Sequence, residues 1–338
     1  MSLLANGNQT AAEPVIDIRR LTRQFNTTTA VDDLSFQVMP GEVFGFIGPN
    51  GAGKTTTMRI LSTLDSPTMG HAWVDGFSVV DDPDRVRSRL GFMPDGFGTY
   101  PNVNCEEYLD FFARSYGIKG DERRSALRHV MEFTQLDRLA QKPVDGLSKG
   151  MKQRLCLGRA LVHDPSVLIL DEPAAGLDPR ARIELREMIV RLAEEGKALL
   201  ISSHILTELA EMCDRVAIIE KGKLLAVGTV DEILNSATGQ IQTGHDVEMV
   251  DATIAFPTLE IQIISPTIEA EQILKKNPAI SKVVTSDQKI RFHFEGDLEQ
   301  RSELLNQLVQ GGIQVVSFRA IEKSLEDAFL QVTKGLIQ

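Results

Sequence analysis

The chain has 338 residues, 42% hydrophobic and 25% charged, which is enough for about two soluble globular domains. Its net charge of −11 argues against a nucleic-acid-binding surface. Three widely spaced cysteines without a C-x-x-C pair argue against a disulfide or metal framework and indicate a reducing compartment. We expect no signal peptide, and no apolar run approaches the ~18 residues of a membrane-spanning helix.

The first residues predict a tail followed by two strands. Residues 1–13 are small and polar, which is typical of a disordered tail. Residues 15–19 and 34–38 alternate between apolar and polar, as half-buried antiparallel strands do. Phe25 lies between them, and taken alone it fits a packing core better than a surface that stacks on a purine ring.

A glycine-rich loop follows the next predicted strand, residues 43–47. Gly48, Gly53, Lys54 and Thr55 match G-x-x-x-x-G-K-[ST], with the loop between a strand and a helix that begins near Lys54. Glycines let the backbone curl so that successive N–H groups point inward, and the helix adds its unpaired N–H groups. The lysine supplies a charge for the β- and γ-phosphates, and the threonine hydroxyl a ligand for Mg²⁺. The motif predicts a polyphosphate site without naming the reaction.

The segment after the loop predicts short elements and then a helical region. Residues 72–76 read as a strand and turn, with Trp73 expected in the core. A short helix over 85–90 leads to a buried strand over 90–94, with Asp95 just beyond it. Residues 104–136 show helical spacing of many aromatic side chains, which fits either a packing core or a groove for a partner helix.

Two further strands are followed directly by polar residues. The apolar run 166–170 predicts a central parallel strand that ends at Asp171 and Glu172, where open α/β sheets place their sites. The strand over 197–202 carries His204 just past its end. Ser148 and Asp178 suit the N-caps of the helices before and after the first of these strands.

The remaining chain predicts a linker and a second domain. A hairpin and a short helix end near residue 234, and residues 236–247 are polar with two glycines, as in a linker. Residues 259–318 then predict the order β-α-β-β-α-β, the split-βαβ layout, followed by a helix over 324–332.

In this order the motifs resemble the nucleotide-binding subunit of an ATP-binding cassette (ABC) transporter. Residues 48–55 match Walker A, 147–151 resemble the LSGGQ signature, and 167–172 match Walker B with its catalytic glutamate. Residues 176–179 match the D-loop, and His204 the switch histidine. The resemblance covers about residues 15–235. The C-terminal part, with Ser324-Leu-Glu-Asp-Ala-Phe329, looks like the tail of a bacterial exporter subfamily, some of whose members serve drug or antibiotic efflux.

The resemblance implies a P-loop NTPase fold with an antiparallel β subdomain, a helical subdomain at about 96–163, and a ferredoxin-like accessory domain at 248–338. It implies that ATP and Mg²⁺ bind between two head-to-tail copies of the chain. Glu172, His204 and Lys54 would be catalytic, and Thr55, Asp171 and Asp95 would face the metal. The nucleotide-binding residues would be Phe25, now as the adenine-stacking aromatic, Val31, Pro49, Asn50, Gly51, Ala52, Gly53, Lys54, Thr55, Thr56, Ser148, Lys149, Gly150 and Asp178.

Two positions depart from the family pattern. Asp95 stands where the family has the Q-loop glutamine, and an unpaired carboxylate there would repel the γ-phosphate although it could bind the metal. Lys149 interrupts the signature and adds a cation beside Ser148 and Gly150, which are kept.

The leading hypothesis is an ATPase domain, residues 14–235, that energises a separate transmembrane permease, for export by analogy, from the cytoplasmic face of the plasma membrane. A second hypothesis is a non-transport ABC ATPase acting on DNA or ribosomes. The single cassette and the acidic charge disfavour it, and we expect no nucleic-acid partner. A small-molecule P-loop kinase is the third, and it leaves the signature and His204 unexplained. For the C-terminal domain, dimerisation and regulation both stay open.

Overall fold

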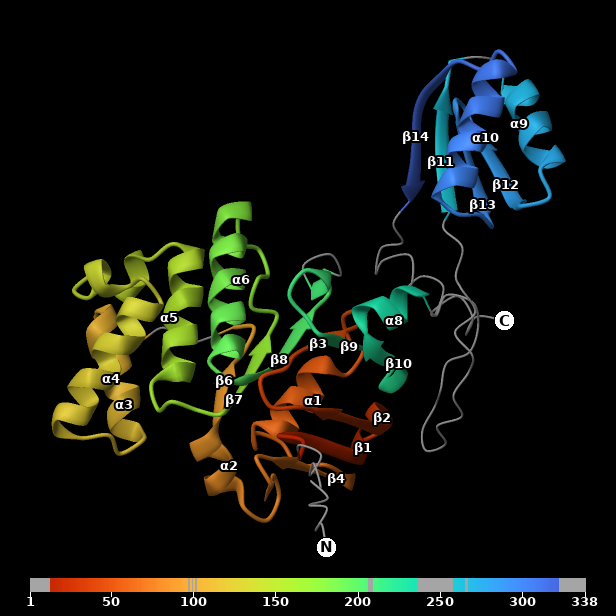
Figure 1. The fold of residues 1–338 in the computed structure, drawn as a ribbon. Helices are drawn as coiled ribbons and strands as arrows, with labels where there is room; N and C mark the ends of the chain where they lie inside the picture. The colour runs from red at the N-terminus through yellow and green to blue at the C-terminus, as the bar shows by residue number, and fades with distance from the viewer. Residues whose placement is uncertain are drawn as a thin grey trace, which may run out of the picture. The chain divides into compact units, whose positions relative to one another are not determined.

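The computed structural model describes residues 13–96, 98, 100, 102–205, 209–235, 258–264 and 267–321. The predicted tail up to residue 12, the linker at 236–247 and the helix at 324–332 lie outside these residues. The described chain forms two compact units, one within residues 1–244 and one within 245–327. Figure 1 shows the elements of both units.

An antiparallel sheet opens the first unit. Its strands are β1 (Ile16–Phe25), β2 (Thr28–Val38), β4 (Met69–Val74) and β5 (Phe77–Ser78), in the order β2-β1-β4-β5. The two predicted strands are therefore confirmed, although both are longer than expected. Trp73 is only half-buried, against expectation, because its partner Asp17 and its neighbour Arg19 lie on the face of the sheet away from the core.

A six-stranded sheet forms the centre of the first unit, in the order β10-β9-β3-β8-β7-β6. Strands β6, β7, β8, β3 and β9 run parallel, and β10 pairs antiparallel with β9. Every residue of β3, β7 and β8 is buried, as expected of apolar strands covered on both faces. Their bounds are β3 Val43–Ile47, β6 Leu90–Met93, β7 Val167–Asp171, β8 Ala198–Ser203, β9 Arg215–Glu220 and β10 Lys223–Thr229.

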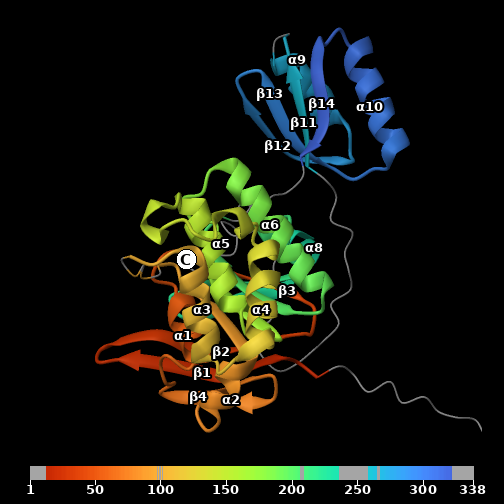
Figure 2. The ribbon, with the colours of Figure 1, turned by 90° about the vertical axis from the view of Figure 1, so that its left-hand side faces the viewer.

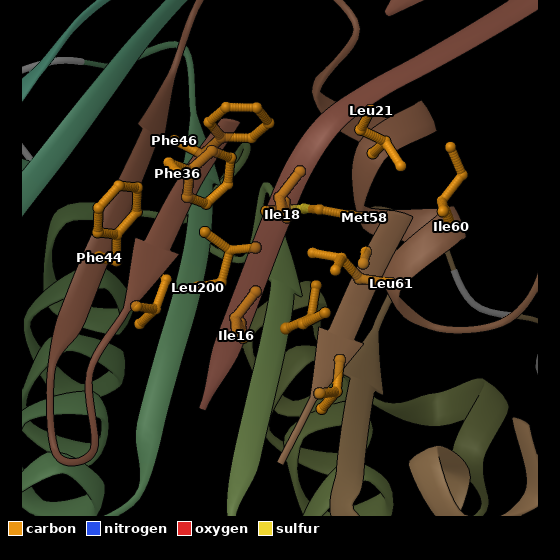
Figure 3. Packing of buried hydrophobic residues seen from close by; sticks show 14 of the residues in the cluster. Ile16, Ile18, Leu21, Phe36, Phe44, Phe46, Met58, Ile60, Leu61 and Leu200 are labelled. Atoms are coloured by element: carbon orange, nitrogen blue, oxygen red, sulfur yellow. The ribbon is translucent and has the colours of Figure 1, made fainter. Parts of the chain in front are cut away.

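The main core lies between these two sheets and includes one face of helix α1 (Lys54–Leu61). Figure 3 shows Met58 of α1 beside Ile18 of β1, and Phe36, Phe44 and Phe46 clustered at the other end of the core. The rings of Phe36 and Phe44 stack with centroids 5.1 Å apart. The core thus fixes α1, and the loop before it, against both sheets.

Helices α3, α4 and α5 pack together beyond β6, the edge strand of the central sheet (Figures 1 and 2). The expected helical stretch at 104–136 is confirmed but divided in two, because the chain turns at Gly117 with φ of 77°. Besides α1, the described residues of this unit include α2 (Pro83–Arg89), α3 (Cys105–Ser115), α4 (Gly120–Phe133), α5 (Lys149–Leu161), α6 (Pro179–Glu194) and α8 (Val230–Asn235), with short 3₁₀ turns at Asp137–Leu139 and Val144–Gly146.

The second unit has the predicted β-α-β-β-α-β order. It contains β11 (Thr258–Ile263), α9 (Thr267–Lys276), β12 (Ile280–Ser286), β13 (Lys289–Phe294), α10 (Leu298–Gln310) and β14 (Val315–Ile321). The strands form an antiparallel sheet in the order β12-β13-β11-β14, and their apolar face packs with the two helices into a separate core. This is the ferredoxin-like arrangement.

Candidate functional site

The polar residues singled out in the sequence gather at one edge of the central sheet. Strands β6, β7, β8 and β3 are parallel neighbours, so their carboxyl ends lie at the same edge. Asp95 follows β6, Asp171 ends β7, and His204 follows β8, while the glycine-rich loop follows β3.

The glycines of this loop serve two different needs. Gly51 and Gly53 adopt φ of 81° and 105°, in the left-handed region that side chains rarely adopt. A Cβ on Gly48 would lie 2.3 Å from the carbonyl oxygen of Ile219, and one on Gly53 would lie 2.4 Å from that of Ala30. The loop is thus held tightly between β9 and β2, in the curled shape that an oxyanion cradle needs.

Lys54 begins α1 and is almost wholly buried, with 5% of its surface exposed. Its ammonium donates to the carbonyl oxygens of Gly48 at 2.7 Å and Pro49 at 3.3 Å. The same nitrogen lies 3.4 Å from Oε1 of Glu172, a carboxylate with 13% exposure. The buried ammonium of Lys54 is held by carbonyl oxygens of its own loop and by one carboxylate. It is therefore positioned to pair with a second anion at the open side of the glycine-rich loop.

Glu172 is held through both its backbone and its side chain. Its backbone has φ of 50°, and its N–H donates to Oγ of Ser202 at 2.9 Å, while that hydroxyl donates to Oδ1 of Asp171 at 2.6 Å. Nδ1 of His204 lies 2.7 Å from Oε2 of Glu172 and donates to it. The other oxygen, Oε1, is buried without a hydrogen-bond partner. A carboxylate fixed by its backbone and one oxygen, with the second oxygen open, is arranged to accept a proton from a bound molecule.

The turn at the start of α5 is a second helix N-terminus with a different environment. Oγ of Ser148 caps it by accepting the Met151 N–H at 3.3 Å, as predicted. Lys149 extends over Gly176, where its Nζ lies 2.3 Å from the place that a Cβ would take. Within the described part of the chain, no hydrogen bond or ion pair joins this turn to the glycine-rich loop.

The other predicted site residues lie on several elements of the first unit. Asp178 caps α6 by accepting the Ala181 N–H at 2.9 Å, as predicted. Phe25 is 43% exposed at the end of β1, and Val31 is buried in β2. Asp95 is exposed, and Thr55 is exposed in the first turn of α1. The remaining members of the set are Pro49, Asn50 and Ala52 of the loop, Thr56 of α1, and Gly150 of α5, which packs against Ala181.

Comparison with known proteins agrees with this geometry. Residues 31–175 match the family model described as "ABC transporter", and residues 253–333 match "ATP-binding protein DrrA1-3-like, C-terminal domain". The chain is 36% identical to Nod factor export ATP-binding protein I of Ralstonia nicotianae, over 67% of this chain and 70% of that protein. A solved ATP-binding subunit of an ABC transporter superposes with a TM-score of 0.61 at 31% identity, covering 66% of this chain and 92% of that one.

The chain belongs to the ATP-binding subunits of ABC transporters. This ABC subunit is also 38% identical to the probable multidrug ABC transporter ATP-binding protein YbhF of Escherichia coli. That match covers 71% of this chain but only 41% of the relative, so the chain spans less than half of YbhF. As a family member the chain binds and hydrolyses ATP. Among the described residues, no helix is both long and apolar enough to cross a bilayer.

The residues of the ABC site also fit a magnesium ion. Asp171 offers one buried carboxylate, already held by Ser202, and the hydroxyl of Thr55 is exposed at the start of α1. No group of three or more His, Cys, Asp or Glu side chains forms a metal cage anywhere in the part that the structure describes. Magnesium suits such a sparse set, because it keeps several waters and takes further oxygens from phosphate.

Sequence reasoning missed Ser202. This ABC subunit pairs Asp171 of β7 directly with Ser202 of β8, and the hydroxyl links the carboxylate of Asp171 to the backbone N–H of Glu172. The sequence indicates this role of Ser202 only weakly, because Ser202 is one of two adjacent serines at the end of a strand. Only the register between β7 and β8 shows that Ser202, and not the adjacent Ser203, lies opposite Asp171.

Proposed function

We propose that two copies of this chain bind ATP and Mg²⁺ in their shared interface, and that hydrolysis drives a separate transmembrane permease. The observation that carries the proposal is the Lys54–Glu172–His204 cluster beside a glycine cradle. Within the described residues, no hydrogen bond or ion pair joins the signature turn of the same chain to that cradle, which agrees with its serving the site of a second copy.

Each residue has a role in this proposal. The loop amides and Lys54 would hold the phosphates, and Thr55 and Asp171 would hold Mg²⁺, which would supply positive charge to the phosphate oxygens. Glu172 accepts a proton from the attacking water through its open Oε1. His204 orients Glu172 through Oε2 and contacts the γ-phosphate.

The second copy of the chain supplies the other side of the ATP site, through its signature turn. Ser148 and the Gly150 N–H lie at a helix N-terminus, where backbone dipoles favour a γ-phosphate. Among the described residues, Lys149 forms no ion pair with an acidic side chain, and it adds a positive charge to this side of the site. Asp178 fixes the start of α6, and so shapes the D-loop next to the same interface.

A surface of the helical subdomain suits the permease. Tyr100 and Phe111 are 51% and 53% exposed, and their rings lie 5.8 Å apart. Phe112 joins them with a ring centroid 5.2 Å from that of Phe111, and Arg159 covers its face. An exposed aromatic cluster of this kind is suited to bind the apolar face of an amphipathic helix. We define these four residues as the aromatic surface.

We test this docking with a charge at the centre of the aromatic surface. Phe111→Glu should abolish co-purification of the chain with a membrane permease while leaving its basal ATPase activity within twofold of the parent. Leu64→Glu is the matched control, because Leu64 is also 53% exposed but lies outside the aromatic surface. Co-purification with ribosomes or DNA, and not with a membrane protein, would favour the non-transport alternative instead.

Asp95 tests the coupling between the permease and the nucleotide. It follows β6, the strand beside Walker B, and it is exposed, so it can face either the metal or the permease. Asp95→Gln should leave ATP binding intact and change the stimulation of ATPase activity by the permease. If neither basal activity nor stimulation moves, position 95 is an ordinary loop residue.

Export is the direction that we propose. The relatives named for multidrug transport and Nod factor export support it, as does the DrrA1-3-like C-terminal domain. The chain would then lie on the cytoplasmic face of the plasma membrane, held there by its permease. Inverted vesicles that contain the chain and its permease should accumulate cargo when ATP is added outside.

A further inference from the structure

Arg23 and Phe25 of β1 form a stacked pair. The two residues are two positions apart on a strand, so their side chains share a face. The guanidinium carbon of Arg23 lies 4.3 Å from the centroid of the Phe25 ring, within the range of a cation–π interaction. Nη2 of Arg23 also pairs with Oδ1 of Asp65 at 2.7 Å.

The exposures show which face of the ring is covered. The side chains of Arg23 and Asp65 are only 22% and 17% exposed, whereas Phe25 is 43% exposed. The guanidinium stacks on one face of the ring and is itself mostly shielded, while 43% of the Phe25 surface stays open to solvent.

This placement of Arg23 is not favourable by itself. Its Nε is buried without a hydrogen-bond partner, which costs free energy that a solvated arginine would not lose. Arg20, also on β1, pairs with Asp33 of β2, and these side chains are 78% and 65% exposed, which is the usual solvated alternative. The ion pair with Asp65 and the contact with Phe25 offset the cost at Arg23.

The stacked pair lies beside the phosphate loop. Phe25 pairs with Thr28 at the tip of the β1–β2 hairpin, and Ala30, two residues further on, touches the loop at Gly53. A nucleotide whose phosphates occupy the loop would thus extend its base toward this tip.

We infer that Arg23, anchored by Asp65, is a positioning residue that holds the Phe25 ring for stacking on the purine of ATP. The inference rests on the proposed function, in which Phe25 stacks on adenine. A ring backed by a buried, anchored cation loses little rotational freedom when a base stacks on its open face, so binding is tighter. Arg23 itself does not touch the nucleotide.

The test is the affinity of the purified full chain for ATP, measured by calorimetry with a non-hydrolysable analogue. Arg23→Met keeps an apolar stem of similar length and removes the charge. Arg23→Met should weaken ATP binding about threefold to tenfold, which corresponds to the usual free energy of a cation–π contact. It should leave kcat within twofold of the parent. Arg23→Lys should recover part of the affinity, and Arg20→Met is the matched control that should bind like the parent.

Combining the substitutions separates this inference from the proposed function. Phe25→Ala should weaken binding more than Arg23→Met, and adding Arg23→Met to Phe25→Ala should cause no further loss. If Phe25→Ala binds ATP like the parent, the adenine site itself is wrong. If Phe25→Ala weakens binding but Arg23→Met leaves it unchanged or tightens it, only the role of Arg23 is wrong.

Discussion

Glu172 of the first unit and Glu260 of the second are both shielded carboxylates, and their environments are opposite. Glu260 is 1% exposed and accepts hydrogen bonds from Arg319 at 2.8 and 3.2 Å and from Arg291 at 2.9 Å. Glu172 has one histidine on one oxygen, a lysine 3.4 Å from the other, and no hydrogen bond on that second oxygen. The carboxylate that holds the sheet together has hydrogen-bond donors on both oxygens, whereas the one suited to chemistry keeps one oxygen without a hydrogen bond.

The titration of Glu260 agrees with its structural role. The hydrogen bonds from Arg319 and then Arg291 lower the pKa of this carboxyl below its ordinary value. It therefore stays charged and ties β11 to its neighbours β13 and β14 through arginines bonded to both of its oxygens.

The largest effect is expected at Glu172. Glu172→Gln keeps the shape and removes the proton acceptor, so turnover should fall at least about a hundredfold while ATP still binds. Phosphate release and analogue binding measure the two quantities. Glu260→Gln is the control and should hydrolyse ATP like the parent. Turnover within tenfold of the parent in Glu172→Gln would remove this residue as the base.

A smaller effect is expected at Ser202, which orders the two carboxylates of the site. Ser202→Ala should lower kcat about tenfold, as loss of an orienting hydrogen bond does, with little change in KM for ATP. Ser166→Ala is the comparison, because Ser166 precedes the opposite end of β7 and bonds Asp75. An unchanged kcat in Ser202→Ala would show that the backbone alone positions Glu172.

Glu260→Gln should affect stability and not activity, by about 1–2 kcal/mol at neutral pH. The pKa of Glu260 is lowered in the folded state, so its contribution is present above its unfolded pKa and is lost as pH falls through its folded pKa. Urea unfolding of parent and variant should differ most near pH 6 and converge below the ordinary glutamate pKa of 4.5. A difference independent of pH would show that packing, and not charge, holds this sheet.

The smallest effect concerns Lys149, a cation without an acid partner among the described residues, in contrast to Lys54. Gly176→Ala should impair turnover, because its Cβ would displace Lys149, and Lys149→Gly should relieve part of that loss. Gly196→Ala measures the cost of a left-handed alanine alone, since Gly196 has φ of 87° and open space around it. Additive losses in the double variant would show that the two positions act independently.

The sequence predicted what is local. The apolar strands β3 and β7, the helix caps at Ser148 and Asp178, and the glycine loop each carry their signal within a few residues, and the structure has them as expected. Ser202, the contact of Lys149 with Gly176 and the stack of Arg23 on Phe25 were missed. The first two depend on which distant strands and helices become neighbours. Arg23 lies beyond residues 15–19, the range that the sequence predicted as a strand, so no local pattern singled it out.

An ATP site shared by two copies of the chain can be tested by mixing two inactive variants of the subunit. Lys54→Ala destroys the loop side of a site, and Ser148→Arg destroys the signature side, so each variant alone should be inactive. Mixed dimers hold one complete site of two, and random pairing makes half of the dimers mixed, so activity should return to about a quarter of the parent's. If the mixture stays as inactive as its components, the site lies within one chain and the account is wrong.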